Sequence, residues 1–518
     1  MRFPFFRARA KTSGRGGMRA FHQTRGFAAA QTDRLLAGWR YDGGFTAGDV
    51  SAYLATIRAR SRQMAKDSPH YKRWLDLWVT NIVGEGFSLK SMPHDGGSLD
   101  RRLDIAAAKT IENHWWRFCT LRSPSGQTYC DASGRKTMAE MDRLLARTWA
   151  RDGEYFVLIT RTDANPYGIE FQIIRPDLCD ERYNLADTGK GTSIQAGVEK
   201  IITTGRPVAY WFKTTATNQA SAYSAGQPLV RIGADRIIHG YTQQDEDQPR
   251  GIPHGYASLV KLKMLDEYDR AELTAARDEA CSVRTYYAPV GQENAIADIA
   301  APENADVANA LLADKEPGQA EILPLGYKQE IHTPQHPNRE LTAFKNSMGR
   351  DIAGGLGVEY SNFFNDWSGV SFSSVRAGTI SERDMWIMFQ DDMISQLKSR
   401  MFLAWLRAFL ESSESGGLPV EKYDKFSEHE FRGRRWLWVD PLKDIKAAET
   451  AVKNGWKTNQ QISEDYGGDY YDNIEEIKRE EAAAKGTALE RTKANEAQQG
   501  QEAGDADQSR DTRGARCY

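Results

Sequence analysis

Apolar residues recur at spacings of three and four through the first 150 residues, and this period predicts amphipathic helices. A hydroxyl cap at Ser68 and a first-turn proline at Pro69 begin one of them, and Gly84 and Gly86 end it. Other helices are expected from about residue 46 through Met64, from about 103 to 120 and from about 137 to 151. The helix after Ser68 collects its apolar side chains on one side: Trp74, Leu75, Trp78, Val79 and Ile82.

The pattern changes between residues 153 and 242. Short runs rich in β-branched and aromatic residues alternate there with Gly, Pro, Asn and Asp, which is typical of strands joined by turns. The runs are Tyr155 to Ile159, Phe171 to Ile174, Val208 to Phe212 and Ile237–Ile238. They predict a β-rich domain with antiparallel strands.

Helical spacing returns from Tyr256 to about Val283. This stretch has an apolar stripe of Leu259, Leu262, Leu265, Tyr268 and Ala271. Away from that stripe it carries Lys261, Asp266, Glu267, Asp269 and Arg270. Such a helix buries one side and leaves the other in water.

The longest helical signal follows a polar loop. A small mixed segment at 284–330 and a helix at about 338 to 353 come first, and Gly354, Gly355 and Gly357 are expected to end that helix. Residues 359–374 form a loop rich in Asn, Ser and aromatic residues. The helix from about 374 to 412 would span roughly 55 to 60 Å, longer than a compact domain is wide, which favours an extended, assembled architecture. Its apolar stripe is Trp386, Phe389, Met393, Leu397, Met401, Trp405 and Phe409.

The last part of the chain is predicted to be helical. A short β segment from Phe431 to Val439 leads through Pro441 into helices, of which the last runs from Tyr470 to Ala484. Beyond Lys485 almost no apolar residue remains, so that tail is expected to be disordered. The order of helices, a β-rich region and further helices gives the α+β fold class.

Composition excludes several classes of protein. A formal net charge of -3 argues against a protein that coats DNA, because that task needs a basic excess. No run of about 18 apolar residues occurs, so no membrane-spanning helix is expected. The five cysteines are odd in number, widely spread and without a C-x-x-C pair, which favours a reducing compartment over a disulfide or zinc framework.

Residues 1–45 are predicted to be a flexible basic arm. The first 32 residues carry six arginines and one lysine without an acidic residue, a composition that imitates a transit peptide. Glycines at 14, 16 and 17 interrupt any amphipathic helix, which favours the arm; cleavage or docking of this segment stays open.

No catalytic constellation is found. The chain has neither a G-x-x-x-x-G-K-[ST] phosphate loop nor a G-x-S-x-G elbow. His332 and His336 have the spacing of a helical metal pair, but two prolines forbid that helix. Adjacent carboxylates at 391–392 and 475–476 point about 100° apart on a helix and are expected in solvent. We therefore predict no catalytic residue, metal or cofactor.

Two aromatic features allow a nucleic-acid interpretation beside a structural one. The stripe of the long helix has the spacing of a core or a subunit interface, which we favour over a nucleotide-stacking surface. Arg435 and Trp436 are interpreted as an anchor at the end of a strand in preference to a nucleic-acid contact.

Several stretches, in order, resemble the portal protein family of lambda-type tailed phages. The N-terminal ones are Ile57-Arg-Ala-Arg-Ser-Arg62 and Asn81-Ile-Val-Gly-Glu-Gly-Phe87. The most specific are Asp235-Arg-Ile-Ile-His239 and Gln248-Pro-Arg-Gly-Ile-Pro253. Later come Ala353-Gly-Gly-Leu-Gly-Val358, Ser371-Phe-Ser-Ser374 with Arg376-Ala377, and a closing region from Gly455 to Glu481. Together they cover about residues 35 to 485.

The resemblance implies a portal fold with named regions. Beyond the arm at 1–45, it implies a wing at 46–255, stem helices at 256–283 and 331–358, and a clip at 284–330. It further implies a tunnel loop at 359–374, a long wing helix and β segment at 375–440, crown helices at 441–484 and a tail at 485–518. An acid-rich segment at 299–320 and Lys66-Asp67, where the family often has two asparagines, depart from the pattern.

The resemblance also implies a passive function. The chain would form a homo-oligomeric ring, a dodecamer in the family, at one capsid vertex, through which double-stranded DNA passes without specific binding. Expected partners are the major capsid and scaffold proteins, the terminase large subunit and the head-tail completion protein, in the virion and, during assembly, in the host cytoplasm. Channel residues would be Asn365, Trp367, Ser371 and Phe372 of the tunnel loop and Asp266, Asp269 and Arg270 of the stem. A nucleic-acid-processing enzyme and a monomeric capsid adaptor are the alternatives.

Overall fold

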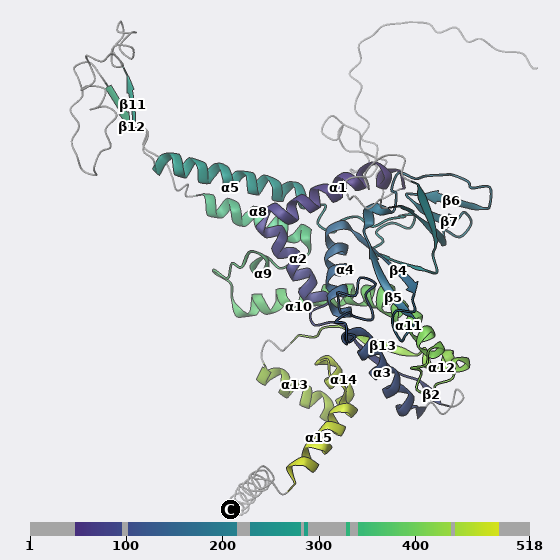
Figure 1. Cartoon of the computed structure of the whole chain (residues 1–518). Helices are drawn as coiled ribbons and strands as arrows, with labels where there is room; N and C mark the ends of the chain where they lie inside the picture. Colours follow the sequence, from purple (N-terminus) through teal and green to yellow (C-terminus); the bar gives the residue numbers. More distant parts are fainter. Residues whose placement is uncertain are drawn as a thin grey trace, which may run out of the picture. The chain divides into compact units, whose positions relative to one another are not determined.

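The computed structural model describes residues 47–95, 102–214, 228–280, 284–287, 328–331, 340–436 and 441–485. These residues combine helices with small antiparallel sheets, which confirms the predicted α+β class (Figure 1). The basic arm, the tail beyond Lys485 and the whole acid-rich segment at 299–320 lie outside the described residues, as do His332 and His336. No helix in the described ranges is long and apolar enough to cross a membrane.

Four helices precede the main sheets, close to where the pattern predicts them. Ser68 caps the second, accepting a hydrogen bond from the Tyr71 amide, and Thr137 forms a capping box with Glu140 on the fourth. Gly153 ends the fourth in the left-handed conformation that favours glycine. The four are α1 (Ala47–Asp67), α2 (Pro69–Ile82), α3 (Ile105–Thr120) and α4 (Met138–Asp152).

The β-rich region consists of two main antiparallel sheets. One has the order β10-β4-β5 and the other β6-β7-β8-β9, so the antiparallel prediction is confirmed. Their strands are β4 (Glu154–Arg161), β5 (Ile169–Ile174), β6 (Thr192–Gln195), β7 (Val198–Ile201), β8 (Pro207–Lys213), β9 (Leu229–Gly233) and β10 (Ile237–Tyr241). Two-stranded pairs are formed by β1 (Ser88–Ser91) with β13 (His429–Arg432), β2 (His94–Asp95) with β3 (Arg102–Leu103), and β11 (Arg284–Tyr287) with β12 (Lys328–Ile331).

The long helical signal forms α10 (Phe372–Met393) and α11 (Ser399–Glu411). A π-helical turn at Ile394–Lys398 joins them, so the expected single α-helix is corrected at this point. Trp386 and Trp405 are fully buried in the main core of the same chain, together with the rest of the predicted stripe. The interpretation of the stripe as core packing is therefore confirmed, and the stripe by itself gives no sign of assembly.

Aromatic rings from distant segments meet at the centre of this core. The Trp78 ring of α2 lies 5.7 Å from that of Trp149 in α4 and 5.6 Å from that of Trp386 in α10, both edge to face. His254 packs among the same rings. Edge-to-face packing stabilises aromatic pairs beyond the burial of their area.

His254 gives the fold a sensitivity to acid. Burial lowers its pKa to about 3, so the folded chain keeps the ring neutral while the unfolded chain protonates it near pH 6.5. The resulting stability is complete above about pH 6.5 and is lost as the pH falls toward 3. When the pH is lowered from 7 to 4, the unfolding free energy of the wild type should fall by about 3 kcal/mol more than that of His254→Phe. Urea unfolding at both pH values measures this. If His254→Phe loses as much unfolding free energy as the wild type, the prediction is wrong. The control is His94→Phe, at a half-buried histidine.

The predicted tunnel loop contains a short helix, which corrects the expectation of a continuous loop. Residues Tyr360–Phe364 form α9, and α10 begins at Phe372, so the irregular part is shorter than predicted. The helix before it, α8 (Leu341–Leu356), includes Gly354 and Gly355 and ends only at Gly357, which has a positive φ. A Cβ on Gly355 would lie 2.2 Å from the Ser258 hydroxyl, so the glycine permits close packing where a break was expected.

The C-terminal helices agree with the predicted starts and ends. Thr458 and Gln461 form a capping box, and the β segment predicted at 431–439 is the shorter strand β13, which begins two residues earlier. The remaining helices are α5 (Leu259–Ala280), α12 (Tyr423–Phe426), α13 (Pro441–Lys453), α14 (Asn459–Asp465) and α15 (Tyr470–Ala484).

Candidate functional site

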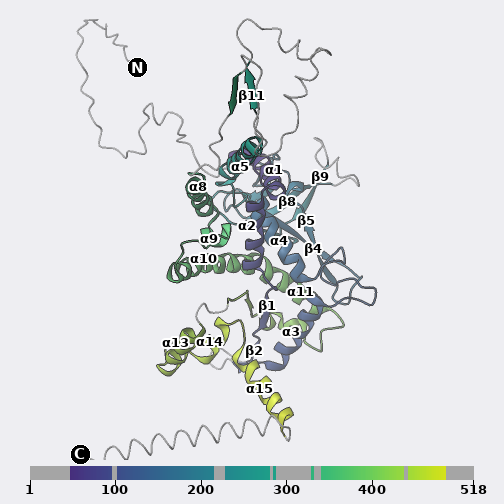
Figure 2. The same cartoon turned by 90° about the vertical axis from the view of Figure 1, so that its left-hand side faces the viewer.

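The predicted stem helices α5 and α8 lie side by side, as Figure 2 shows. Two ion pairs join them: Lys261 to Asp351 at 3.0 Å and Lys345 to Asp269 at 2.9 Å. Next to the first residue of α5, the Ser258 hydroxyl donates to the Ile352 carbonyl of α8. The two helices are thus fixed as a unit.

The three predicted channel residues of α5 have different surroundings. Arg270 is exposed and Asp266 is half-buried. Asp269 is half-buried as well and pairs with Lys345 of α8. Asp269 follows the buried residues Leu265 and Leu262 by four and seven positions, which places it on the side of α5 that packs on α8. Its carboxylate therefore contacts the neighbouring helix.

The predicted tunnel-loop residues occupy one connection between α9 and α10. Asn365 ends α9 with a φ of 56°, and its amide oxygen accepts a hydrogen bond from the indole of Trp367 at 3.4 Å. Trp367 leaves half of its surface exposed. Ser371 caps α10 by accepting from the Ser374 amide, and Phe372 is the first helical residue.

A carboxylate pair anchors this connection to α10. Glu359 accepts from the Asn362 amide at 2.8 Å, and the side chain of Asn362 donates to Glu382 at 3.4 Å. Glu382 also accepts from the Trp386 indole. Burial raises the pKa of Glu382, and the negative charge of Glu359 acts in the same direction. The backbone before Trp367 is therefore tied to the core, while the indole itself faces outward.

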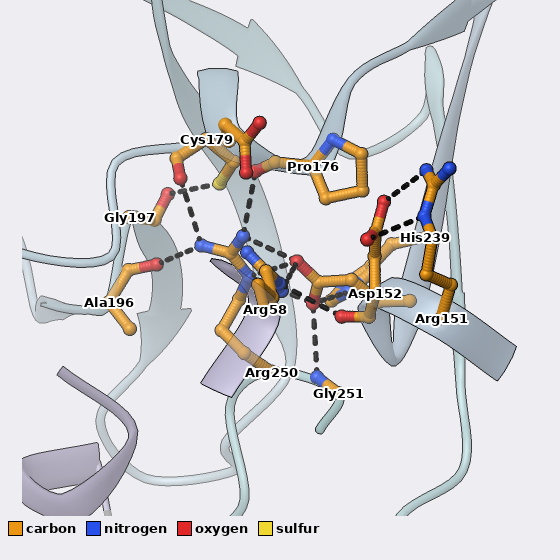
Figure 3. A network of polar contacts seen from close by, with 12 residues as sticks. Arg58, Arg151, Asp152, Pro176, Cys179, Ala196, Gly197, His239, Arg250 and Gly251 are labelled. Atoms are coloured by element: carbon orange, nitrogen blue, oxygen red, sulfur yellow. Dashed lines mark hydrogen bonds and ion pairs between the residues drawn. The ribbon is translucent and has the colours of Figure 1, made fainter. Parts of the chain in front are cut away.

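The most densely connected polar site is a buried network around Glu154, the first residue of β4 (Figure 3). Its carboxylate pairs with Arg58 of α1 at 2.5 Å, with Arg250 on the segment before α5, and with His239 of β10 at 3.0 Å. The Gly251 amide donates to the same carboxylate at 3.0 Å. The Arg250 guanidinium also donates to the carbonyls of Pro176, Cys179 and Ala196.

A second carboxylate extends the network toward the surface. Asp152 at the end of α4 accepts from Arg62 of α1 at 2.8 Å and from Arg151, and Arg62 reaches Asp177 at 2.6 Å. The Ser61 hydroxyl donates to the Arg151 carbonyl at 2.6 Å. One face of α1 is thereby fastened to the junction of α4 and β4.

Charge balance sets the protonation of this network. Burial by itself would raise the pKa of Glu154, but the charges of Arg250 and Arg58 and the hydrogen bond from His239 hold that pKa well below its usual range. Burial lowers the pKa of His239 despite the neighbouring carboxylate, so the ring is neutral near pH 7. Arg58, Glu154 and Arg250 are almost completely closed to solvent. The arrangement holds α1, β4, β10 and the segment before α5 together.

Three of the motifs that carry the family resemblance meet at this network. Arg58 and Arg62 belong to the first, His239 to the Asp235–His239 motif and Arg250 to the Gln248–Pro253 motif. Sequence reasoning missed Glu154, their common partner. The sequence did contain a sign of it, because Glu154 stands alone at the start of a strongly apolar run. A carboxylate buried in such a run needs cationic partners.

The second buried pair was also missed. Lys398 in the π-helical turn donates to Asp142 of α4 at 2.9 Å, and both side chains are 1% exposed. The ammonium lies within 6 Å of the ring centres of Phe87, Trp115 and Phe431. Trp436, interpreted as an anchor at the end of a strand, lies four residues beyond the end of β13, and its indole donates to Asn81 at 3.1 Å.

Known proteins are similar to this chain over most of its length. The probable portal protein of Halomonas phage phiHAP-1 is 31% identical over 441 residues, covering 83% of this chain and 81% of that protein. Portal protein B of Escherichia phage lambda is 23% identical over 472 residues, covering 83% and 84%. The portal protein of Escherichia phage N15 is 22% identical over 477 residues, with the same coverage.

Solved structures give more distant similarities. A chain from the neck of an empty gene transfer agent particle aligns with a TM-score of 0.46 at 13% identity, covering 80% of this chain and 92% of that one. A portal protein of the HK97 family from Corynebacterium diphtheriae aligns with a TM-score of 0.30 at 12% identity, covering 75% and 98%. The model of the family described as phage portal protein, lambda family, matches residues 32–390. Since that match covers more than half of the sequence, the chain belongs to the lambda family of phage portal proteins.

Proposed function

We propose that this chain is the portal subunit of a tailed phage: a ring at one capsid vertex that serves as the channel for DNA packaging and ejection and as the head-tail connector. The observation that carries the proposal is the 31% identity over 83% of the chain with a probable portal protein. The proposed partners are the major capsid and scaffold proteins, the terminase large subunit and the head-tail completion protein. The proposed locations are the portal vertex and, during assembly, the host cytoplasm.

Exposed apolar side chains on α5 support assembly into a ring. Met264 is 60% exposed and Leu273 is 72% exposed. They are nine residues apart, which at roughly 100° per residue places them on opposite sides of the helix. A closed ring uses two different surfaces of each subunit, because every copy contacts one neighbour on each side. Apolar groups on both sides of one helix suit that arrangement.

The proposed channel combines the connection at 365–371 with the paired helices α5 and α8 as a stem. Trp367 is the exposed aromatic side chain of the connection, between Asn365 and Ser371. A channel that lets a duplex slide has to avoid many tight phosphate contacts, and a net charge of -3 supplies no basic excess. The clip is proposed at 284–330 and the crown at 441–484.

A passive function is favoured over the enzyme alternative. The matching relatives are named portal proteins, and the buried ionic network around Glu154 is closed to solvent. Within the described ranges, no group of three His, Cys, Asp or Glu side chains is arranged to hold a metal ion.

Assembly can be tested on the purified full chain. The wild type should form particles of many subunits with a central hole, measured by mass photometry and negative-stain electron microscopy. The double change Met264→Glu and Leu273→Glu should release chains of 58.2 kDa, because it places carboxylates in both proposed contacts.

The control is Ile202→Glu, at an apolar residue of the β-rich region that is 52% exposed. This variant should assemble as the wild type does. Circular dichroism separates loss of assembly from loss of fold. Rings from the Met264 and Leu273 variant would refute the α5 contacts, and a monomeric wild type would refute the ring.

A further inference from the structure

A cleft of about 1190 Å³ lies between α3, the start of α4 and the segment 432–435. It is larger than a pocket for a small ligand, for which roughly 300 to 1,000 Å³ is usual. The proposed portal function assigns nothing to it. One of its walls is formed by Phe87, Ser88 and Leu89, which places strand β1 in the cleft.

Strand β1 presents an unpaired edge. It pairs only with β13 in the described structure, where Ser88 is opposite Arg432 and Leu89 is opposite Phe431. On the other edge, the Ser91 amide points away from β13 and donates to the Glu112 carboxylate of α3 at 2.7 Å. Because alternate residues of a strand point the same way, the Leu89 amide is directed to that edge too. The Ser91 amide thus has the Glu112 side chain as its acceptor in place of a neighbouring strand. The Leu89 amide has no such acceptor among the described residues.

The floor of the cleft holds a buried polar group with an unused atom. Asp142 is 1% exposed and lines the cleft; one of its carboxylate oxygens accepts from Lys398, but the other has no partner among the described residues. The Nε of Arg432, another lining residue, is likewise buried without a partner there. Buried polar atoms without partners are rare in folded proteins and indicate a missing contact.

The charges around the cleft identify the partner. Its lining carries the cations Arg143, Lys398, Arg432, Arg434 and Arg435 against the anions Glu85, Glu112 and Asp142. Lys398 already pairs with Asp142, and Arg432 pairs with Glu464 and Asp469 outside the lining, so the remaining positive charge lies with Arg143, Arg434 and Arg435. This excess of positive charge favours an acidic ligand. The two terminal segments of this chain fit poorly, since residues 1–45 carry nine basic and two acidic residues and residues 486–518 carry five and six. Residues 288–327 carry seven acidic residues and one basic residue, so this segment of a second copy is a competing occupant, which hydrogen exchange without peptide tests. We take a segment of a different protein as the occupant.

We propose that an extended acidic peptide of a partner protein binds in this cleft by adding a third strand at the free edge of β1. Backbone hydrogen bonds at Leu89 would supply register, and acidic side chains would face the arginines at the rim. Two-stranded sheets are marginal, so an added strand completes a more stable unit. The inference stands independently of the ring, because every residue that carries it belongs to one chain.

The test uses the full-length protein and a fluorescein-labelled octapeptide of alternating Glu and Val. Fluorescence anisotropy should show saturable binding, about tenfold tighter than for the octapeptide of alternating Lys and Val. Hydrogen exchange at Leu89 should slow when the acidic peptide binds. Arg143→Glu, at the exposed rim, should weaken binding about tenfold, whereas Arg60→Glu, on exposed α1 surface, should leave it unchanged.

A backbone variant isolates the strand edge. Leu89→Pro removes the edge amide and should abolish binding, whereas Leu89→Ala loses the same side chain but keeps the amide. If Leu89→Pro fails to fold, the Arg143 comparison still decides. Equal binding of the acidic and basic peptides, or no saturable binding, overturns the proposal. Protection of Leu89 in the assembled protein without peptide also overturns it, because a second copy would then be the occupant.

Discussion

Glu154→Gln is expected to lower the unfolding free energy by about 3 to 5 kcal/mol, although the side chain keeps its size. The glutamine amide cannot neutralise Arg58 and Arg250, whose guanidinium groups are buried on either side of it. Two uncompensated cations in the protein interior cost far more than the lost hydrogen bonds. The effect should spread from α1 to the segment before α5, because both are fastened at this carboxylate.

Urea unfolding followed by tryptophan fluorescence measures this loss. Glu85→Gln, which removes an exposed carboxylate, is the matched control and should change stability by less than about 0.5 kcal/mol. Hydrogen exchange should rise first in α1 and at the end of α4, where the network is anchored. If Glu154→Gln unfolds at the same urea concentration as the control, the network around Glu154 does not stabilise the fold.

Lys398→Met should cost a similar amount, about 3 to 5 kcal/mol, because it leaves Asp142 buried without its cation. The second change Asp142→Leu in the same chain should restore most of the loss, since replacing both partners of a buried ion pair by apolar groups is often close to neutral. The methionine fills the space among Phe87, Trp115 and Phe431.

A double-mutant cycle in urea measures the coupling between the two residues. The single and double variants are compared with Lys263→Met, at an exposed lysine of α5 whose loss should be small. Additive losses at Lys398 and Asp142 would contradict the prediction. The double variant also reports on the cleft, because Asp142 lies at its floor.

The sequence predicted elements well where local physics decides them. Ser68 begins a helix because its side chain accepts from an amide that the first turn leaves free, and Pro69 fits that turn because it has no amide hydrogen to satisfy. Trp386 and Trp405 were predicted to face one side because helical spacing puts them there, and that side is the core. The motifs placed the chain in its family without revealing what their arginines contact.

The sequence failed where distant segments decide the outcome. Gly355 signals a helix end by its propensity, yet it remains inside α8 because close packing on Ser258 needs a residue without a side chain. Asp269 pairs with Lys345, which lies in another helix and was not predicted as its partner. Neither neighbour can be found from spacing along one segment.

By itself the sequence determined the helices, the β-rich region, the α+β class and membership of a portal family, because caps, apolar periods and ordered motifs are local properties. Only the tertiary structure decided that Arg58, His239 and Arg250 share Glu154, that Lys398 pairs with Asp142, and that β1 keeps a free edge in a cleft. Each of these contacts joins residues at least 85 positions apart, or depends on a strand that is missing. Desolvated charges must find partners wherever the fold brings them, and no local pattern encodes which residue that will be.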